Sequence, residues 1–162
     1  MDEKNNRKWI YGILGLLTGV IICALLMVAI VPSKMIVTRE SKLGFDETVA
    51  TVKERIIEQG WSVKGVDEIS RSINKAGYEF KPKVTLIKLC RAEYAKSVLT
   101  TDRYVSCLMP CTMSVWEGDD GKVYLSEMNM SLMAGLFGGN IKEVMGGRVV
   151  RDEEKMLEGI LK

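Results

Sequence analysis

An uninterrupted apolar segment near the N-terminus constrains this chain more than any other feature. The segment runs from Trp9 to Val31 and carries no charged side chain in its 23 residues. A helix of that length covers roughly 34 Å, enough to cross the ~30 Å hydrocarbon core of a bilayer. A soluble domain of the remaining size has no room to bury such a helix on all sides. The sequence therefore predicts a transmembrane helix at residues 9–31, after a short tail at residues 1–8.

The predicted helix fits a retained anchor better than a cleaved signal peptide, whose apolar region spans about 7–15 residues. Pro32 disfavours cleavage directly before it, and no small-x-small cleavage motif follows. Three basic residues flank each side of the helix, but Arg7 and Lys8 abut it directly. This asymmetry favours a cytoplasmic N-terminus. We therefore expect a single-pass protein with the lipid bilayer around residues 9–31 and its remaining domain outside the cytoplasm.

Small residues form a stripe along the same segment, at Gly12, Gly15, Gly19 and Cys23. Gly15 and Gly19 make a GxxxG motif, which lets two membrane helices approach closely. Glycine is also common in membrane helices that have no partner. The stripe is thus consistent with helix packing between two copies of the chain and with ordinary membrane-helix composition.

The chain contains no histidine among its 162 residues. Histidine-based acid–base catalysis and histidine-ligated zinc or copper are therefore excluded within the chain. The net charge is only +2, and no basic run with interleaved aromatic residues occurs. This gives no electrostatic case for nucleic acid as a partner. Neither a GxxxxGK[ST] nor a GxGxxG motif is present, so no phosphate-binding loop is predicted.

Alternating strand and helix patterns fill the rest of the chain. Residues 32–40 read as a juxtamembrane segment and a first strand, and residues 41–162 as one α+β domain. We expect strands at 35–38, 61–64, 84–90, 104–116 and 122–127, and helices at 45–59, 67–77, 91–99, 129–137 and 141–162. The 84–90 strand is expected at the centre of the sheet, and the turn at 118–121 joins a hairpin. The predicted architecture is a single mixed or antiparallel sheet with helices mainly on one face.

Sulfur side chains are concentrated between residues 107 and 113. If this segment is an extended strand, four sulfur atoms share one face, those of Cys107, Met109, Cys111 and Met113. Cys90 ends the preceding predicted strand and would lie near this row. Two cysteines at i and i+4 of a straight strand are about 13 Å apart, too far for a disulfide. A bend at Pro110, or pairing with Cys90, would be required to form one.

Three interpretations of these sulfur atoms remain open. Buried cysteine and methionine often only fill a core. A reactive thiolate or a disulfide would instead carry redox or sulfur-transfer chemistry. Thiolates and thioethers together would bind a soft metal ion such as Cu(I). Asn129, just past the last predicted strand, is suited either to line a pocket or to cap a helix.

Short sequence pieces spread over the domain resemble the DUF302 family, whose fold is called TT1751-like. The pieces are Ser41-Lys42-Leu43-Gly44-Phe45-Asp46-Glu47-Thr48, Gly60-Trp61, Ala76-Gly77-Tyr78, the strand at 84–90 with Tyr94-Ala95, Met109-Pro110-Cys111, Gly121-Lys122-Val123-Tyr124 and Met128-Asn129. The match as a whole runs from about residue 35 to residue 160. The resemblance implies a compact α+β fold, often dimeric, with no established activity.

The same resemblance singles out particular cysteines. The recurrent Pro-Cys of the family falls on Pro110 and Cys111, which makes Cys111 the first candidate for a catalytic residue. A strand-end cysteine of the family falls on Cys90, whereas Cys107 is outside the family pattern. The membrane helix is an addition to the family domain.

These observations predict a membrane-anchored binding or accessory module, expected to be dimeric, whose pocket lies near Cys90, Cys111 and Asn129 and takes a small ligand or a soft metal ion. One alternative is a thiol-based redox or sulfur-transfer protein using Cys111 with Cys90 or Cys107. Another is a structural subunit that docks onto a larger membrane complex. The sequence leaves open whether the chain is an enzyme and which cofactor it uses.

Overall fold

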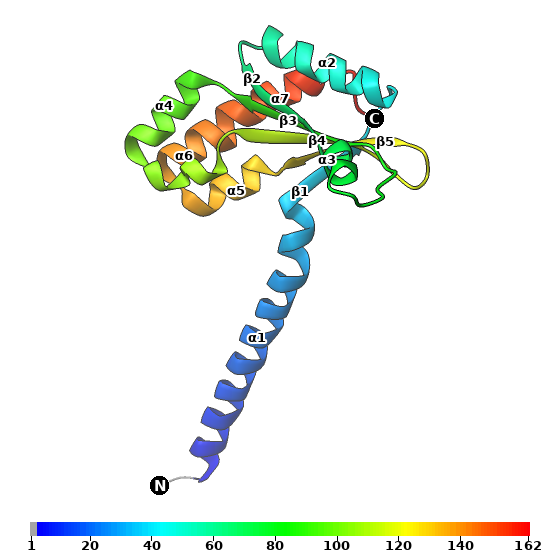
Figure 1. The fold of residues 1–162 in the computed structure, drawn as a ribbon. Coiled ribbons are helices and arrows are strands. Elements are labelled where there is room, and N and C mark those ends of the chain that lie inside the picture. Colours follow the sequence, from blue (N-terminus) through cyan, green and yellow to red (C-terminus); the bar gives the residue numbers. More distant parts are fainter. Residues whose placement is uncertain (1–2) are drawn as a thin grey trace. The chain divides into compact units, whose positions relative to one another are not determined.

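The computed structural model describes residues 3–162 and divides them into two compact units (Figure 1). The first unit is the helix α1 (Glu3–Met35), and the second is the domain Ile36–Lys162. Within α1, the stretch Tyr11–Met35 is long and apolar enough to cross a membrane. An added Cβ at Gly12, Gly15 or Gly19 would meet open space. Pairing of two α1 helices through these glycines stays a prediction.

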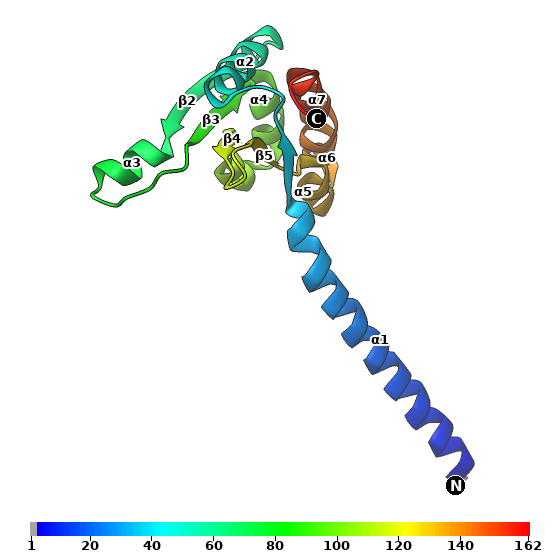
Figure 2. The ribbon, with the colours of Figure 1, turned by 90° about the vertical axis from the view of Figure 1, so that its right-hand side faces the viewer.

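The domain alternates strands and helices in the predicted order, with three more short helical segments than predicted. In chain order its elements are β1 (Ile36–Glu40), α2 (Phe45–Glu58), β2 (Ser62–Glu68), α3 (Ile69–Lys75), β3 (Val84–Cys90), α4 (Ala92–Thr101), the 3₁₀ helix η1 (Arg103–Leu108), β4 (Cys111–Glu117), β5 (Val123–Met128), α5 (Met130–Phe137), α6 (Gly139–Glu143), the π-helix η2 (Val144–Val149) and α7 (Val150–Leu157). Figure 2 shows α5, α6 and α7 following one another along one side of the domain.

The five strands form one antiparallel sheet in the order β1-β5-β4-β3-β2. The 84–90 strand is a central strand as expected, because β3 is paired with β2 on one side and with β4 on the other. The middle of the five strands is β4. The hairpin between β4 and β5 forms as predicted, with Gly121 at a φ of 75° in its turn. A positive φ is inexpensive only for glycine, which explains this residue at this position.

One face of the sheet carries the core. Thr85, Ile87 and Leu89 of β3 are buried, and the residues between them are half-buried. Cys111, Met113 and Val115 repeat the pattern on β4. The two rows lie on the same face, since successive strand residues alternate between faces.

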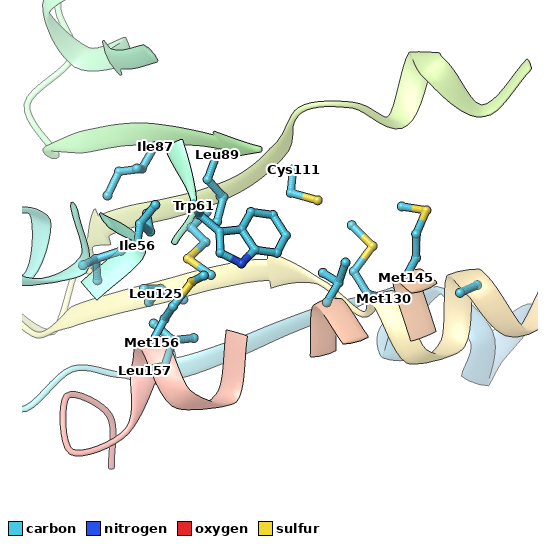
Figure 3. Close-up of a cluster of buried hydrophobic side chains, with 14 of the residues drawn as sticks. Ile56, Trp61, Ile87, Leu89, Cys111, Leu125, Met130, Met145, Met156 and Leu157 are labelled. Carbon is cyan, nitrogen blue, oxygen red and sulfur yellow. The ribbon is translucent and has the colours of Figure 1, made fainter. Parts of the chain in front are cut away.

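The helix α2 covers part of that face with one apolar side. Its buried residues Thr48, Val52 and Ile56 are spaced four apart, which places them on a single side of the helix. Val52 and Ile56 join inward strand residues and residues of α7 in one continuous core (Figure 3). Asp46 and Glu47 sit in the first turn of α2, where the helix dipole favours acids.

Three predicted elements differ from the structure. The segment expected to be extended from residue 104 is instead helical as far as Leu108, and β4 begins only at Cys111. Pro110 has no N–H to give to a sheet ladder, which accounts for a strand that starts directly after it. The helix expected at 67–77 starts at Ile69, because Asp67 is paired within β2 and forms an ion pair with Lys88 at 2.6 Å. The helix expected at 141–162 is divided into α6, η2 and α7 and ends at Leu157.

Candidate functional site: a sulfur-lined pocket

A small pocket lies at the end of the sheet where β3 ends and β4 begins. The helices α4 and η2 face it. Its volume is about 20 Å³, close to the space taken by a single water-sized sphere. Four sulfur-containing residues line it, Cys90, Met109, Cys111 and Met145, and we call it the sulfur pocket. The other lining residues are Trp61, Leu89, Arg91, Tyr94, Ala95, Val98, Val144 and Val149. The pocket is therefore mostly apolar and rich in soft donor atoms.

The strand pairing places the two cysteines of the pocket at one end of the sheet. Cys90 is the last residue of β3, and Cys111 is the first residue of β4, which is antiparallel to β3. Cys111 pairs with Leu89, the neighbour of Cys90, so the two cysteines lie at the same end of adjacent strands. Both thiols are free in the structure.

The opposite wall comes from η2. Met145 is 4 % exposed within this π-helix, and a π-turn of this kind is often associated with functional sites. Figure 3 shows the Cys111 thiol and Met145 facing the same interior space as the indole of Trp61. Gly146 follows Met145, and a Cβ there would come within 3.2 Å of the Ala134 side chain. The small residue thus lets η2 pack closely on α5.

A hydrogen-bonded cluster encloses the pocket beside Trp61, and Asp152 of α7 is its centre. Its Oδ2 atom accepts hydrogen bonds from Trp61 Nε1 at 3.0 Å, from Arg91 Nη1 at 3.0 Å and from the Tyr94 hydroxyl at 3.1 Å. The Trp61 and Tyr94 rings meet edge to face at 5.7 Å, and the Arg91 guanidinium lies 4.7 Å from the Tyr94 ring centre. We call these four residues the Asp152 cluster.

Burial determines the protonation of Cys111. Removal from water raises the pKa of its thiol to about 12, and the nearby Glu153 carboxyl and Cys90 thiol contribute further in the same direction. The thiol of Cys111 is therefore protonated at neutral pH. A resting thiolate nucleophile needs the opposite environment, with a cation or a helix N-terminus that lowers the pKa.

A second, more polar pocket of about 180 Å³ is lined by Glu153 and residues of β1, β5 and α5. Arg39 of β1 and Glu127 of β5 face each other in it, with a 2.6 Å ion pair. Arg39 Nε and Glu127 Oε2 are buried and have no hydrogen-bond partner within residues 3–162. Burial raises the pKa of Glu127, which Arg39 partly offsets, and raises the pKa of Glu153 to about 8. Glu153 thus favours its neutral form at neutral pH.

The structure brings together some of the predicted site residues and separates others. Cys90 and Cys111 share the sulfur pocket, and Met109 joins them. Asn129 lies in the second pocket, where its side chain caps α5 by accepting a hydrogen bond from the Leu132 amide at 3.0 Å. The predicted ligand group of Cys90, Cys111 and Asn129 is therefore divided between two pockets.

The predicted row of four sulfur atoms does not form. Cys107 is exposed in η1 and its Sγ lies 3.7 Å from the carbonyl oxygen of Tyr104. Met113 is 1 % exposed and belongs to the core of the sheet. The row required the strand predicted from residue 104 onward, but η1 replaces the first part of that strand. Within the described part of the chain, no three His, Cys, Asp or Glu side chains are arranged to hold a metal ion.

Several residues of the site could not be identified from the pattern of sulfur atoms. Arg91, Asp152, Glu153 and Met145 carry no motif, and the acidic run after Arg151 is typical of a solvated helix face. Trp61 and Tyr94 did occur among the pieces that resemble a known family. Their role as neighbours of the same carboxylate becomes visible only when α4 and α7 are placed around the sheet.

The sheet, with one covered face, and its helices define a small two-layer α+β domain. Residues 37–162 match the family model described as "Domain of unknown function DUF302". The chain therefore belongs to the DUF302 family, as the sequence pieces indicated. Its fold is similar to a crystal structure of an uncharacterized conserved DUF302 protein from Bacillus stearothermophilus, with a TM-score of 0.68 and 18 % identity over 75 % of this chain and 95 % of that chain. No curated protein matches the chain.

Proposed function

We propose that this protein is a membrane-anchored module that binds a soft metal ion, Cu(I) being the best fit, in the sulfur pocket. The observation that carries the proposal is one apolar pocket of about 20 Å³ lined by two cysteines and two methionines. An organic ligand does not fit so small a space, because ligand pockets usually span about 300–1,000 Å³. Thiolate and thioether sulfur select Cu(I) over hard cations such as magnesium.

Protonation of the Cys111 thiol supports metal binding more than redox catalysis. Cys111 holds its proton with a pKa of about 12, so it offers no thiolate to a disulfide or persulfide substrate at rest. Cu(I) forms a Cu–S bond as the S–H bond breaks and the proton leaves to solvent.

The binding test is an anaerobic Cu(I) titration of the full-length protein against a chromogenic chelator. Cys111→Ser and Cys90→Ser are expected to weaken Cu(I) affinity by at least about 100-fold, since even outer-shell changes cost 10–100-fold. Cys107→Ser is the matched control, because this exposed cysteine lies outside the pocket. Met145→Leu tests the thioether at nearly constant volume, with Met133→Leu as its control.

The pH dependence provides a second readout. Because Cys111 is protonated up to about pH 12 without metal, the affinity should rise about tenfold per pH unit for this thiol between pH 6 and 8. Equal affinity in wild type and both pocket serine variants, with native near-ultraviolet circular dichroism retained, would refute the Cu(I) site. An affinity independent of pH would show that Cys111 is not a ligand.

The anchor is the second part of the proposal and rests on the length and apolar character of Tyr11–Met35. The protein should stay with the membrane fraction after carbonate extraction at alkaline pH, and release into the supernatant would contradict a spanning helix. Exposed Cys107 gives a natural probe of orientation. A membrane-impermeant maleimide should label it in intact cells if the domain faces outward, and Cys107→Ser should remove the signal. Labelling only after lysis would place the domain in the cytoplasm.

A further inference from the structure

An open groove separates α2 from α3 at the end of the sheet where β3 begins. Its volume is about 810 Å³, and Arg71, Asn74 and Lys75 of α3 form one wall. The facing wall carries residues spaced three and four apart on α2, which present one side of that helix: Phe45, Asp46, Val49 and Lys53. The groove is distinct from the sulfur pocket, and the two share no lining residue.

Basic residues dominate the rim of this groove. Five cations line it, Lys53, Arg71, Lys75, Lys81 and Lys83, against the two acids Asp46 and Glu68. Exposed acids pair with three of the cations at 3.3–3.5 Å, and such surface pairs are weak. Lys53 and Lys75 form no ion pair with any described residue. One unpaired ammonium group therefore stands on each wall.

The floor between these cations is apolar. Val66 of β2 is 38 % exposed, although it is a large hydrophobic residue on a strand. Phe80 and Val84 continue the floor from the adjoining loop into β3. Phe45 borders it on α2, with the Lys83 ammonium 5.3 Å from its ring centre. The groove thus offers a hydrophobic surface beneath a positive rim.

Hydrogen bonds fix the α3 wall in place. Asn74 Nδ2 donates to the Phe80 carbonyl at 3.0 Å, and its Oδ1 accepts from the Phe80 amide at 2.8 Å. Ser70 Oγ donates to the Pro82 carbonyl at 2.6 Å and accepts from the Val84 amide at 2.7 Å. Because both ends of the loop are tied to α3, the wall is organised before any ligand arrives, which lowers the ordering cost of binding.

We propose that this groove binds a small organic anion, a phosphate or carboxylate joined to an apolar or aromatic body. The volume lies in the range of small-molecule sites, and an apolar floor with a few placed charges is their usual composition. Lys53 and Lys75 contact the anionic group, and the floor around Val66 and Phe80 contacts the body. This site is independent of Cu(I) binding.

The test uses 1-naphthyl phosphate as the probe and full-length protein in phosphatidylcholine nanodiscs. Acetylation of lysines is followed by mass spectrometry as the probe is titrated. Labelling of Lys53 and Lys75 should slow saturably, by about tenfold at ten times the Kd, because labelling then follows the free fraction. Lys96 and Lys155 lie outside the groove and report non-specific protection in the same sample.

The control compounds separate the parts of the proposal. Neutral 1-naphthol and inorganic phosphate should each protect much less, since each lacks one of the two recognised features. Lys75→Ala should weaken protection of Lys53, whereas Lys155→Ala should leave it unchanged. Equal slowing at Lys96, equal protection by inorganic phosphate, or no protection would overturn the site. Protection by anionic-lipid nanodiscs without probe would also overturn it, because the groove would then face lipid headgroups.

Discussion

Replacing buried Glu153 with glutamine is expected to stabilise the domain at neutral pH and to leave its stability at pH 4 unchanged. Glu153 is 7 % exposed, and burial raises its pKa from 4.5 to about 8. The unfolded chain ionises this carboxyl above pH 4.5, whereas the folded chain keeps it protonated up to about pH 8. Glu153 therefore lowers the free energy of unfolding, and this loss grows as the pH rises from 4.5 to 8. At pH 7 the cost is about 3 kcal/mol, since each pKa unit corresponds to about 1.4 kcal/mol.

Urea unfolding at pH 4, 6 and 8 measures this effect. The free energy of unfolding of Glu153→Gln should exceed that of wild type by an amount that increases across the series. Glu154→Gln is the matched control, since Glu154 is the exposed neighbour on the same helix and should change stability by less than about 0.5 kcal/mol. Parallel pH profiles of wild type and Glu153→Gln would show that the carboxyl is ionised in the fold.

The neighbours of Glu153 explain why its charge is not compensated. Arg39 is the nearby cation, but its guanidinium already pairs with Glu127. Glu127 and Asp152 both raise the pKa of Glu153 further. Glu153 in turn raises the pKa of Cys111, so loss of its carboxylate should help Cys111 to lose its proton above pH 8. The stability experiment therefore also bears on metal loading of the sulfur pocket.

The sheet could largely be predicted because its signals are local. Alternation of inward and outward residues defines β3 and β4, and the Gly118–Gly121 turn sets the register between β4 and β5. The order of strands is not local information, and the apolar character of β3 indicated only that it lies between two other strands. The helical η1 was missed because Val105 and Leu108 suit a strand equally well, while tertiary packing places only Val105 in the core.

The two cysteines of the pocket could be predicted, but the groups that determine their chemistry could not. Cys90 and Cys111 stand at strand ends, and antiparallel pairing brings such ends together. Asp152 comes from α7, about 60 residues after Arg91, and nothing in the sequence marks it as different from Glu154. A buried acid is recognised by the donors around it. Those donors come from the connection before β2, the connection before α4, and α4 itself.

Asp152→Ala is expected to destabilise the domain by about 2 to 3 kcal/mol and to open the sulfur pocket. Asp152 is 13 % exposed, and one of its oxygens accepts three hydrogen bonds. Alanine would leave the Trp61 indole N–H and the Arg91 guanidinium without this acceptor. Since both residues line the pocket, their loosening should raise the reaction rate of the Cys90 and Cys111 thiols with a thiol reagent on the order of tenfold.

Two control variants separate the hydrogen bonds from the charge and from general surface effects. Asp67→Ala removes an exposed carboxylate whose ion pair with Lys88 measures 2.6 Å, and it should cost less than about 1 kcal/mol. Asp152→Asn keeps one carbonyl oxygen as acceptor and should fall between wild type and Asp152→Ala in both urea unfolding and thiol labelling. If Asp152→Ala lowered stability without changing the labelling rate, the Asp152 cluster would hold α7 on the sheet without controlling access to the pocket. A parallel increase in labelling and in the rate of Cu(I) uptake would identify the cluster as the barrier between the sulfur atoms and solvent.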